Sequence, residues 1–438
     1  MKKFFKPKRI AAAFLSLFFA ASLAACADLE KSGITEKNYG YVGGAADCGD
    51  VDTAFGVETD GGYVYRETSG DTASAVEREY ERQAGLITAS GWNDNDHYAE
   101  YVSLLKREDN VEQAGKFAGI TAAGGWGLIT SDRVKVSVKK DGLPVAGAKA
   151  VAKDDDGNVL FTAKTLADGT AYLFPAREKG KITVSGGGAE ISADFDGKNR
   201  ETEINLTAAD QKVNRIKLML VVDVTGSMGD ELRYLKTELG DVVKRVSARD
   251  ENTEIDLALL FYRDDGDYEK FAFYDFVNAN DGQAMDAQLK NLAKQVASGG
   301  GDYPEAVDEA LDIAVKSGWG DDTSTKLIFH VLDAPPHSNG DEQDEYERRF
   351  KNAVYTAAGK GIRINPVICS GADLLTEYLM RQAAVLTGGT FVFVTDDSGI
   401  GDAHRDPEIP NAVVEKLNDL LVRLITGYHT GDFGLNNQ

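Results

Sequence analysis

The second half of the sequence alternates short apolar runs with amphipathic segments. The runs predict buried strands at residues 216–222, 255–262, 271–276, 327–332, 362–368 and 391–394. Between most of them, apolar residues recur at spacings of three and four, beginning with Leu232 and Leu235, which predicts helices. Because strands this apolar must be covered on both faces, we predict a doubly wound α/β domain over residues 214–428, followed by a tail at 429–438. Pro366 argues against a central position for its strand, because proline cannot donate a hydrogen bond to the ladder.

The periodicity is different upstream of this domain. In residues 86–132, Tyr98, Tyr101 and Leu105 lie at helical spacing and predict a small helical segment. Residues 133–207 alternate apolar and polar positions, as in VKVSV, and contain Asp-Gly turns, which predicts a small all-β sandwich. In the stretches PVAGAKA and TLADGTAYLFP this segment resembles carboxypeptidase-regulatory-like or bacterial Ig-like domains.

The N-terminal residues 1–25 place five basic residues before an apolar stretch, which predicts an export signal. The signal ends in LAAC and resembles the lipobox of bacterial lipoproteins, which implies that Cys26 receives diacylglycerol and becomes the mature N-terminus. A lipid anchor would hold the exported protein at the membrane of the bacterial cell envelope, in the periplasm or at the cell surface. Residues 26–85 are rich in Gly, Asp, Thr and Ala and predict a flexible linker.

The composition argues against several classes of partner. Asp and Glu (71) outnumber Lys and Arg (48), giving a formal charge of −23 that repels phosphate backbones, so no nucleic-acid partner is expected. No glycine run matches a phosphate-binding pattern, so no nucleotide is expected. If Cys26 is lipidated, Cys48 and Cys369 remain, and both a disulfide and two free thiols stay open.

Oxygen-bearing side chains follow several predicted strands. Asp223, Thr225 and Ser227 come at spacings of two directly after the first apolar run, and Asp333 closes a later run. Asp302 lies in the loop SGGGDYPEA, between two predicted helices. Because loops after parallel strands meet at one edge of the sheet, we expect these side chains to surround a hard divalent cation, Mg²⁺ first, with Mn²⁺ or Ca²⁺ as alternatives.

These loops, in this order, carry a family resemblance. DVTGS, GGGDYPEAVDEAL and VLDAPPH look like the three loops of the metal-ion-dependent adhesion site (MIDAS) of a von Willebrand factor A (VWA) domain, and FYRDDGDY matches bacterial members. The resemblance implies that Asp223, Thr225, Ser227 and Asp333 are metal ligands. Asp302 stands where many members have threonine, so it is expected to ligate the cation either directly or through water.

The residues around Asp302 also allow a purely structural role for this side chain. Asp302 and Glu305 have the spacing of a capping box, with Pro304 near the start of a helix predicted over residues 304–315. Asp302 could therefore cap that helix, either instead of ligating a cation or in addition to it.

Three functions remain open from the sequence. The leading hypothesis is a lipid-anchored envelope protein, not an enzyme, whose cation binds an acidic side chain of a partner protein. The first alternative is a metal-dependent hydrolase with Asp264, Asp302 or His337 as general base, although the sequence shows no paired base and orienting group. The second is a structural envelope protein that binds through its β-sandwich.

Overall fold

The computed structural model describes residues 86–106, 115–338, 342–396, 405–410 and 412–434. All of them belong to the second of two compact units, Ser69–Gln438. The predicted export signal, Cys26, the linker with Cys48, and the last four residues of the tail lie outside the described residues. None of the described helices is both long and apolar enough to span a membrane.

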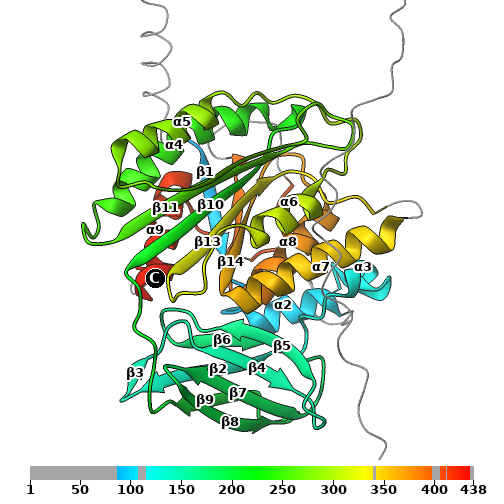
Figure 1. The fold of residues 1–438 in the computed structure, drawn as a ribbon. Helices are drawn as coiled ribbons and strands as arrows, with labels where there is room; N and C mark the ends of the chain where they lie inside the picture. The colour runs from blue at the N-terminus through cyan, green and yellow to red at the C-terminus, as the bar shows by residue number, and fades with distance from the viewer. Residues whose placement is uncertain (1–85, 107–114, 339–341, 397–404, 411, 435–438) are drawn as a thin grey trace, which may run out of the picture. The chain divides into compact units, whose positions relative to one another are not determined.

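An eight-stranded mixed sheet forms the centre of the described unit (Figure 1). In spatial order its strands are β12 (Phe271–Asn278), β11 (Glu254–Tyr262), β10 (Arg215–Asp223), β13 (Thr325–Leu332), β14 (Ile362–Ile368), β15 (Phe391–Val394), β1 (Thr88–Trp92) and β16 (Val414–Lys416). The five strands from β11 to β15 are parallel, whereas β12 and β1 run antiparallel to their neighbours. The six strands predicted from apolar runs are confirmed.

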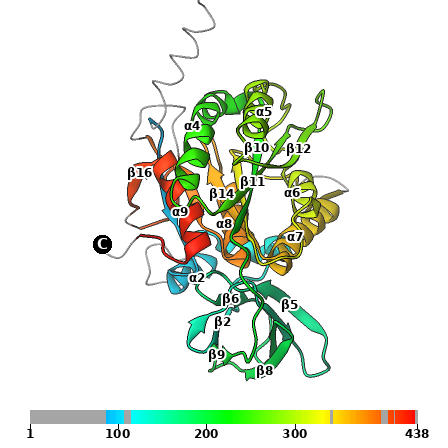
Figure 2. The ribbon, with the colours of Figure 1, turned by 60° about the vertical axis from the view of Figure 1, so that its left-hand side comes forward.

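Helices cover both faces of this sheet, because alternate side chains of each central strand point to opposite sides. In β10, Leu218 and Leu220 join the apolar cluster under α4 (Gly229–Ser247), α5 (Gly282–Ala293) and α9 (Leu417–Thr430). Met219 and Val221 join the cluster under α6 (Val307–Lys316), α7 (Gln343–Lys360) and α8 (Leu374–Thr387). Figure 2 shows α4 and α9 on one side of the sheet and α6 and α7 on the other. The mixed α/β fold is thus established.

The segment before residue 133 is built into the same unit. Its strand β1 pairs antiparallel with β15 and β16, and its helices α2 (Tyr98–Leu105) and α3 (Ala118–Ala122) and the 3₁₀ turn η1 (Gly125–Gly127) follow. Asp94, just after β1, forms an ion pair of 2.6 Å with the buried Arg381 of α8, which also bonds Glu377 at 3.1 Å. The sequence gives no sign of this strand, because TASGW has no strand periodicity.

Residues 134–205 form two four-stranded sheets. One contains β2 (Val134–Lys140), β3 (Leu143–Pro144), β6 (Thr170–Leu173) and β9 (Glu201–Asn205), and the other β4 (Lys149–Lys153), β5 (Val159–Lys164), β7 (Gly180–Gly186) and β8 (Ala189–Phe195). Their inward residues belong to the apolar cluster of the α7 side. At the contact with α7, the rings of Phe161 and Tyr355 meet edge to face with centroids 5.3 Å apart.

Proline in β14 does not place that strand at an edge, so the expectation from Pro366 is wrong. The strand lies between β13 and β15. Its pairing with β15 begins only at Val367, so the missing N–H of Pro366 leaves no gap in that ladder.

Candidate functional site

The candidate site lies where the parallel strands end. Asp223 is the last residue of β10, and Asp333 follows the last residue of β13. Both are buried, at 0% and 4% exposure. The turn after β10 is short because Gly226–Met228 forms a single 3₁₀ turn that leads directly into α4. Because β10 and β13 are parallel, the two acids lie at the same edge of the sheet, as the sequence predicts.

Asp223 is held by its own turn. Its Oδ1 accepts hydrogen bonds from the backbone N–H of Thr225 at 2.9 Å and from the Thr225 hydroxyl at 2.7 Å. Its Oδ2 is buried and has no hydrogen-bond partner among the described residues. Burial, followed by the charge of Asp333, raises the pKa of Asp223 to about 7, and the two Thr225 bonds and the nearby Tyr262 hydroxyl only moderate that rise.

Asp333 and Ser227 are also brought together. Burial raises the pKa of Asp333 to about 6, a hydrogen bond with Ser227 opposes the rise, and the charge of Glu231 adds to it. Asp333 Oδ1 is buried and has no hydrogen-bond partner among the described residues. Asp223, Thr225, Ser227 and Asp333 therefore lie in one neighbourhood, as the sequence predicts.

The third acid of this neighbourhood is Glu305, which sequence reasoning missed. Glu305 is 4% exposed, and its Oε2 is buried with no hydrogen-bond partner among the described residues. Burial raises its pKa to about 9, with further contributions from the charges of Asp223, Asp264 and Asp333, while a hydrogen bond with Thr225 lowers it. These interactions place the Glu305 carboxyl group beside the turn after β10.

Asp302, in contrast, is exposed. The structure does not form the capping box expected from Asp302 and Glu305, because α6 begins at Val307 with Ala306 as its N-cap and no side-chain cap bond. Glu305 lies in the loop instead, where its N–H bonds the Pro335 carbonyl at 3.0 Å. The spacing of the two acids is visible in the sequence. The residue at which α6 begins is not, and that residue decides whether the two acids can form a capping box.

A neighbouring loop holds in place the three consecutive glycines at 299–301, which we call the glycine run. Gly300 has a φ of +75°, and an added Cβ would lie 2.9 Å from Glu305 Oε1 and 3.3 Å from Thr225 Cβ, so only glycine lets the loop approach this closely. The Gly300 N–H donates to Asp267 Oδ2 at 2.9 Å. The buried Arg263 guanidinium donates to the carbonyls of Ser298, Val296 and Glu269 at 3.0–3.2 Å. The motif FYRDDGDY thus supplies the side chains that fix the glycine run.

The same motif supplies an acid that pairs with histidine. Asp264 is 3% exposed, and its Oδ1 lies 2.6 Å from His337 Nε2. Among the described residues, no group of three or more His, Cys, Asp and Glu side chains forms a ready-made metal cluster. Any cation at this edge would be held by carboxylates and the Thr225 and Ser227 hydroxyls together.

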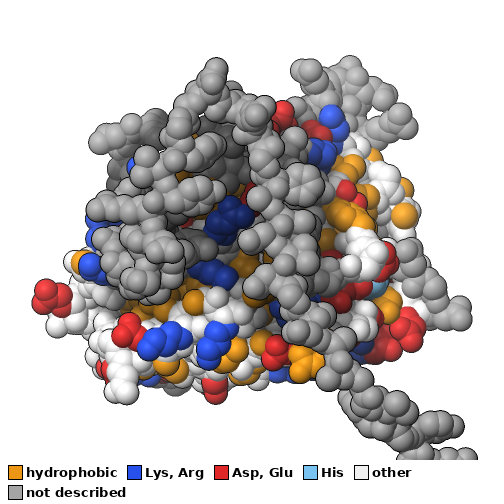
Figure 3. Space-filling view, turned by 90° about the horizontal axis from the view of Figure 1, so that it is seen from above, with side chains coloured by type: hydrophobic (Ala, Val, Ile, Leu, Met, Phe, Trp, Pro, Cys, Tyr) orange, Lys and Arg blue, Asp and Glu red, His pale blue; other side chains and the backbone are white. Residues whose placement is uncertain are grey.

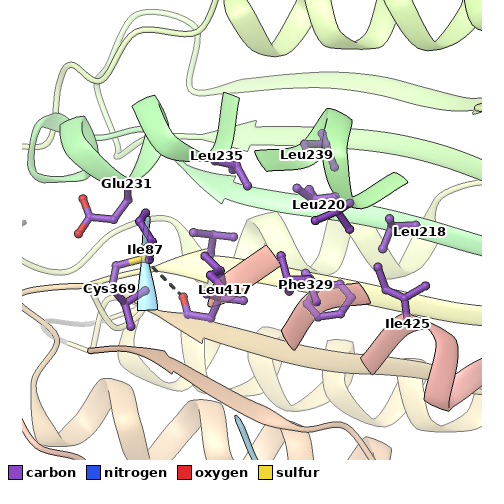
Figure 4. Close-up of a pocket in the computed structure, with 15 residues that line it drawn as sticks. Ile87, Leu218, Leu220, Glu231, Leu235, Leu239, Phe329, Cys369, Leu417 and Ile425 are labelled. Atoms are coloured by element: carbon purple, nitrogen blue, oxygen red, sulfur yellow. Dashed lines mark hydrogen bonds between the residues drawn. The ribbon is translucent and has the colours of Figure 1, made fainter. Parts of the chain in front are cut away.

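An apolar cavity lies behind the site, between α4, the sheet and α9 (Figure 4). Its cavity volume is about 40 Å³, and it is lined mainly by aliphatic side chains such as Leu220 and Leu417. Glu231 and Cys369 lie at one end of it, in the labelled view. The Glu231 carboxylate accepts hydrogen bonds from the Ser370 hydroxyl and N–H. Cys369 is a free, buried thiol, and burial raises its pKa.

Comparison with known proteins identifies part of this architecture. A family model described as von Willebrand factor A domain matches residues 217–352, a range that includes Asp223, Glu305 and Asp333. The chain therefore contains a VWA domain. An ariadne-like RING finger protein of Acanthamoeba polyphaga mimivirus is 27% identical over 195 residues, which are 41% of this chain and 18% of that protein.

Two further similarities are more distant. The alpha-protein kinase vwkA of Dictyostelium discoideum is 21% identical over 206 residues, covering 47% of this chain and 31% of the kinase. The chain thus spans less than a third of the length of either curated relative. The pilus adhesin SpaC of Lactobacillus rhamnosus GG in its open conformation is 11% identical, with a TM-score of 0.36, and the match covers 65% of this chain and 34% of the adhesin.

Proposed function

Because residues 217–352 belong to a VWA domain, we propose that this protein binds a partner protein through a divalent cation held at the carboxyl edge of its sheet. Asp223, Thr225, Ser227 and Asp333 would hold the cation, and Glu305 would face it from the loop after the glycine run. Mg²⁺ suits this donor set because it prefers oxygen ligands and keeps several waters. An acidic side chain of the partner would replace one of those waters.

One observation carries the proposal. Asp223 Oδ2, Asp333 Oδ1 and Glu305 Oε2 are buried carboxylate oxygens without hydrogen-bond partners among the described residues, and they come from three separate parts of the chain. A buried acceptor without a partner is destabilising by about 1–3 kcal/mol, and more when it is charged. Burial is the largest cause that raises the pKa of each of the three carboxyl groups. A divalent cation would neutralise this charge and use the unpaired oxygens.

The wider role is proposed on the sequence alone. An export signal over residues 1–25 and lipid on Cys26 would place the VWA domain at the bacterial cell envelope, in the periplasm or on the surface. The linker of residues 26–85 would give the domain reach: a flexible chain of this length spans roughly 40–45 Å. In this arrangement, residues 133–207 would act as a β-sandwich spacer or as a second contact surface.

The test is a calorimetric titration of the purified protein with Mg²⁺ or Mn²⁺. We expect saturable binding that Asp223→Ala abolishes, because this change removes a central ligand. Glu305→Gln should weaken binding by at least tenfold, whereas the isosteric Asp302→Asn, at an exposed position, should leave affinity nearly unchanged. If Asp302→Asn weakens binding and Glu305→Gln does not, Asp302 and not Glu305 would be the third acid of the site. Equal affinity of the wild type and Asp223→Ala for the cation would refute the proposed site.

The pairing of His337 with Asp264 supports a second candidate, a metal-dependent hydrolase. A general base needs an orienting group, and the 2.6 Å contact supplies one beside Glu305, a pairing that the sequence did not reveal. The decisive measurement is Mg²⁺-dependent turnover of a panel of esters and phosphate esters, compared with His337→Gln. Turnover that the substitution abolishes would favour the hydrolase, and no turnover would favour partner binding.

A further inference from the structure

A second cavity lies at the opposite end of the parallel strands, where the central sheet meets the end of β5. Its cavity volume is about 40 Å³, and its lining is mainly polar. Its lining brings together five basic residues from four parts of the chain: Lys164, Lys212, Lys326, Lys360 and Arg363. We call this the basic cavity.

The positions of these residues follow from the strand directions. Lys326 is the second residue of β13, and Arg363 is the second residue of β14. Both therefore lie at the amino ends of their strands, whereas Asp223 and Asp333 lie at or just beyond carboxyl ends. Lys164 closes β5 at the same contact, where the Arg363 guanidinium donates to its carbonyl at 2.7 Å. The basic cavity is thus separate from the candidate cation site.

Few acids neutralise the basic cavity. Lys164 pairs with Asp321 at 2.8 Å, but the Asp321 side chain is 99% exposed, and Lys326 lies 3.9 Å from Asp322. The ion pairs between described residues include none for the other three basic side chains. Their hydrogen bonds end on carbonyl oxygens: Lys212 on His429, Lys360 on Val315, and Arg363 on Thr387 and Lys164.

Two of the basic groups are deeply buried. Lys326 is 2% exposed and Arg363 is 6% exposed. A buried charge is destabilising unless an opposite charge compensates it. Consistent with this, burial together with the charge of Lys164 lowers the pKa of Lys326 to about 8.

The carbonyl contacts do not use up the donors of the basic cavity. A lysine ammonium has three N–H donors and an arginine guanidinium has five, so each side chain can bond a carbonyl and an anion together. The surrounding chain makes the excess of positive charge unusual, because the protein is acidic overall. On the described part of the face in Figure 3, acidic and basic side chains are interspersed. The basic cavity instead concentrates one sign of charge.

We propose that the basic cavity binds a small oxyanion of the phosphate class, either free phosphate or the phosphoryl group of a small ester. Lys326, Lys360 and Arg363 would supply charge-assisted hydrogen bonds, since Arg and Lys are the usual protein ligands of phosphate oxygens. Lys164 and Lys212 would add positive charge at the rim. The bound anion would neutralise the buried charge between the central sheet and the β4–β5 sheet.

The proposal is tested by calorimetry and thermal unfolding of the full chain with two probes, inorganic phosphate and glycerol phosphate, at constant ionic strength set with chloride. We expect millimolar or tighter binding and a rise in Tm. Lys360→Met is the main variant, because Lys360 is only half-buried and its loss should not prevent folding. Affinity should fall about tenfold or more, as expected for the loss of one charge-assisted hydrogen bond.

Matched variants make the result decisive. Lys326→Met should also weaken binding, whereas Lys290→Met, which removes an exposed lysine of α5, should not. Binding of both probes would support a phosphoryl group of an ester, and binding of inorganic phosphate alone would support free phosphate. No binding of either probe, or binding unaffected by Lys360→Met and Lys326→Met, would overturn the proposal.

Discussion

Replacing Asp223 by asparagine should stabilise the metal-free protein at alkaline pH. The substitution keeps the shape of the side chain, and the amide oxygen can still accept the two hydrogen bonds from Thr225. It removes a buried negative charge that lies close to Asp333 and Glu305. A substitution at a buried, hydrogen-bonded position would ordinarily be expected to destabilise, so the sign of the effect is informative.

The magnitude follows from the pKa. The carboxyl group has a pKa of about 7 in the folded protein, compared with its ordinary value of 3.8, so the folded state binds more protons between these values. Stability therefore falls as the pH rises from about 4 to 7, and the loss is complete above the folded pKa. The difference between a pKa of 3.8 and one of about 7 corresponds to an upper bound of about 4 kcal/mol on the loss of stability, and after relaxation and water entry we expect about 1–2 kcal/mol.

The assay is thermal unfolding in EDTA and in Mg²⁺ at several pH values. In EDTA at pH 8, Asp223→Asn should raise Tm by a few degrees, and near pH 4 the two proteins should coincide. In Mg²⁺ the wild type should gain stability, by about 2.7 kcal/mol at a concentration one hundred times Kd, and the variant should gain little. The Mg²⁺ effect should increase with pH, because the ligands must be deprotonated.

The control is Asp286→Asn on the exposed side of α5, which makes the same change in net charge away from the site. It should alter neither the EDTA curve nor the response to Mg²⁺. A lower Tm for Asp223→Asn in EDTA at pH 8, together with an undiminished Mg²⁺ response, would refute the electrostatic reasoning.

Two further predictions concern the framework around the site. Arg263→Met should lower the unfolding free energy by about 2 kcal/mol or more and speed proteolysis of the glycine run, because three carbonyls lose a charged donor. Arg263→Lys should recover part of the lost stability. Equal rates of proteolysis for both variants and the wild type would contradict this role of Arg263. Arg381→Met should destabilise by about 3–5 kcal/mol in urea, because it leaves the buried Asp94 without its cation and leaves Glu377 with Arg405 alone. A loss below about 1 kcal/mol would show that this triad does not fix β1 to the domain.

The local patterns of the sequence determined the main sheet. Five of the six apolar runs encode a strand by themselves, because burial on both faces requires nearly every residue to be apolar. The sixth, β12, is an antiparallel edge strand that is only partly buried. A local pattern also predicts the turn after β10, because residues two apart in such a turn, here Asp223 and Thr225, lie within hydrogen-bonding distance. The prediction of a VWA domain followed from these loops and is confirmed by the family match.

Only the tertiary structure decided three other features. Strand β1 joins the sheet through pairing with β15, some three hundred residues away, which no local pattern encodes. The burial of Glu305 and the exposure of Asp302 depend on a loop held by Arg263 and Asp267 from another part of the chain. The basic cavity likewise collects lysines that are separated widely in sequence. Periodicity and turn residues act between near neighbours, whereas the direction in which a loop side chain points is set by whichever distant segment packs against it.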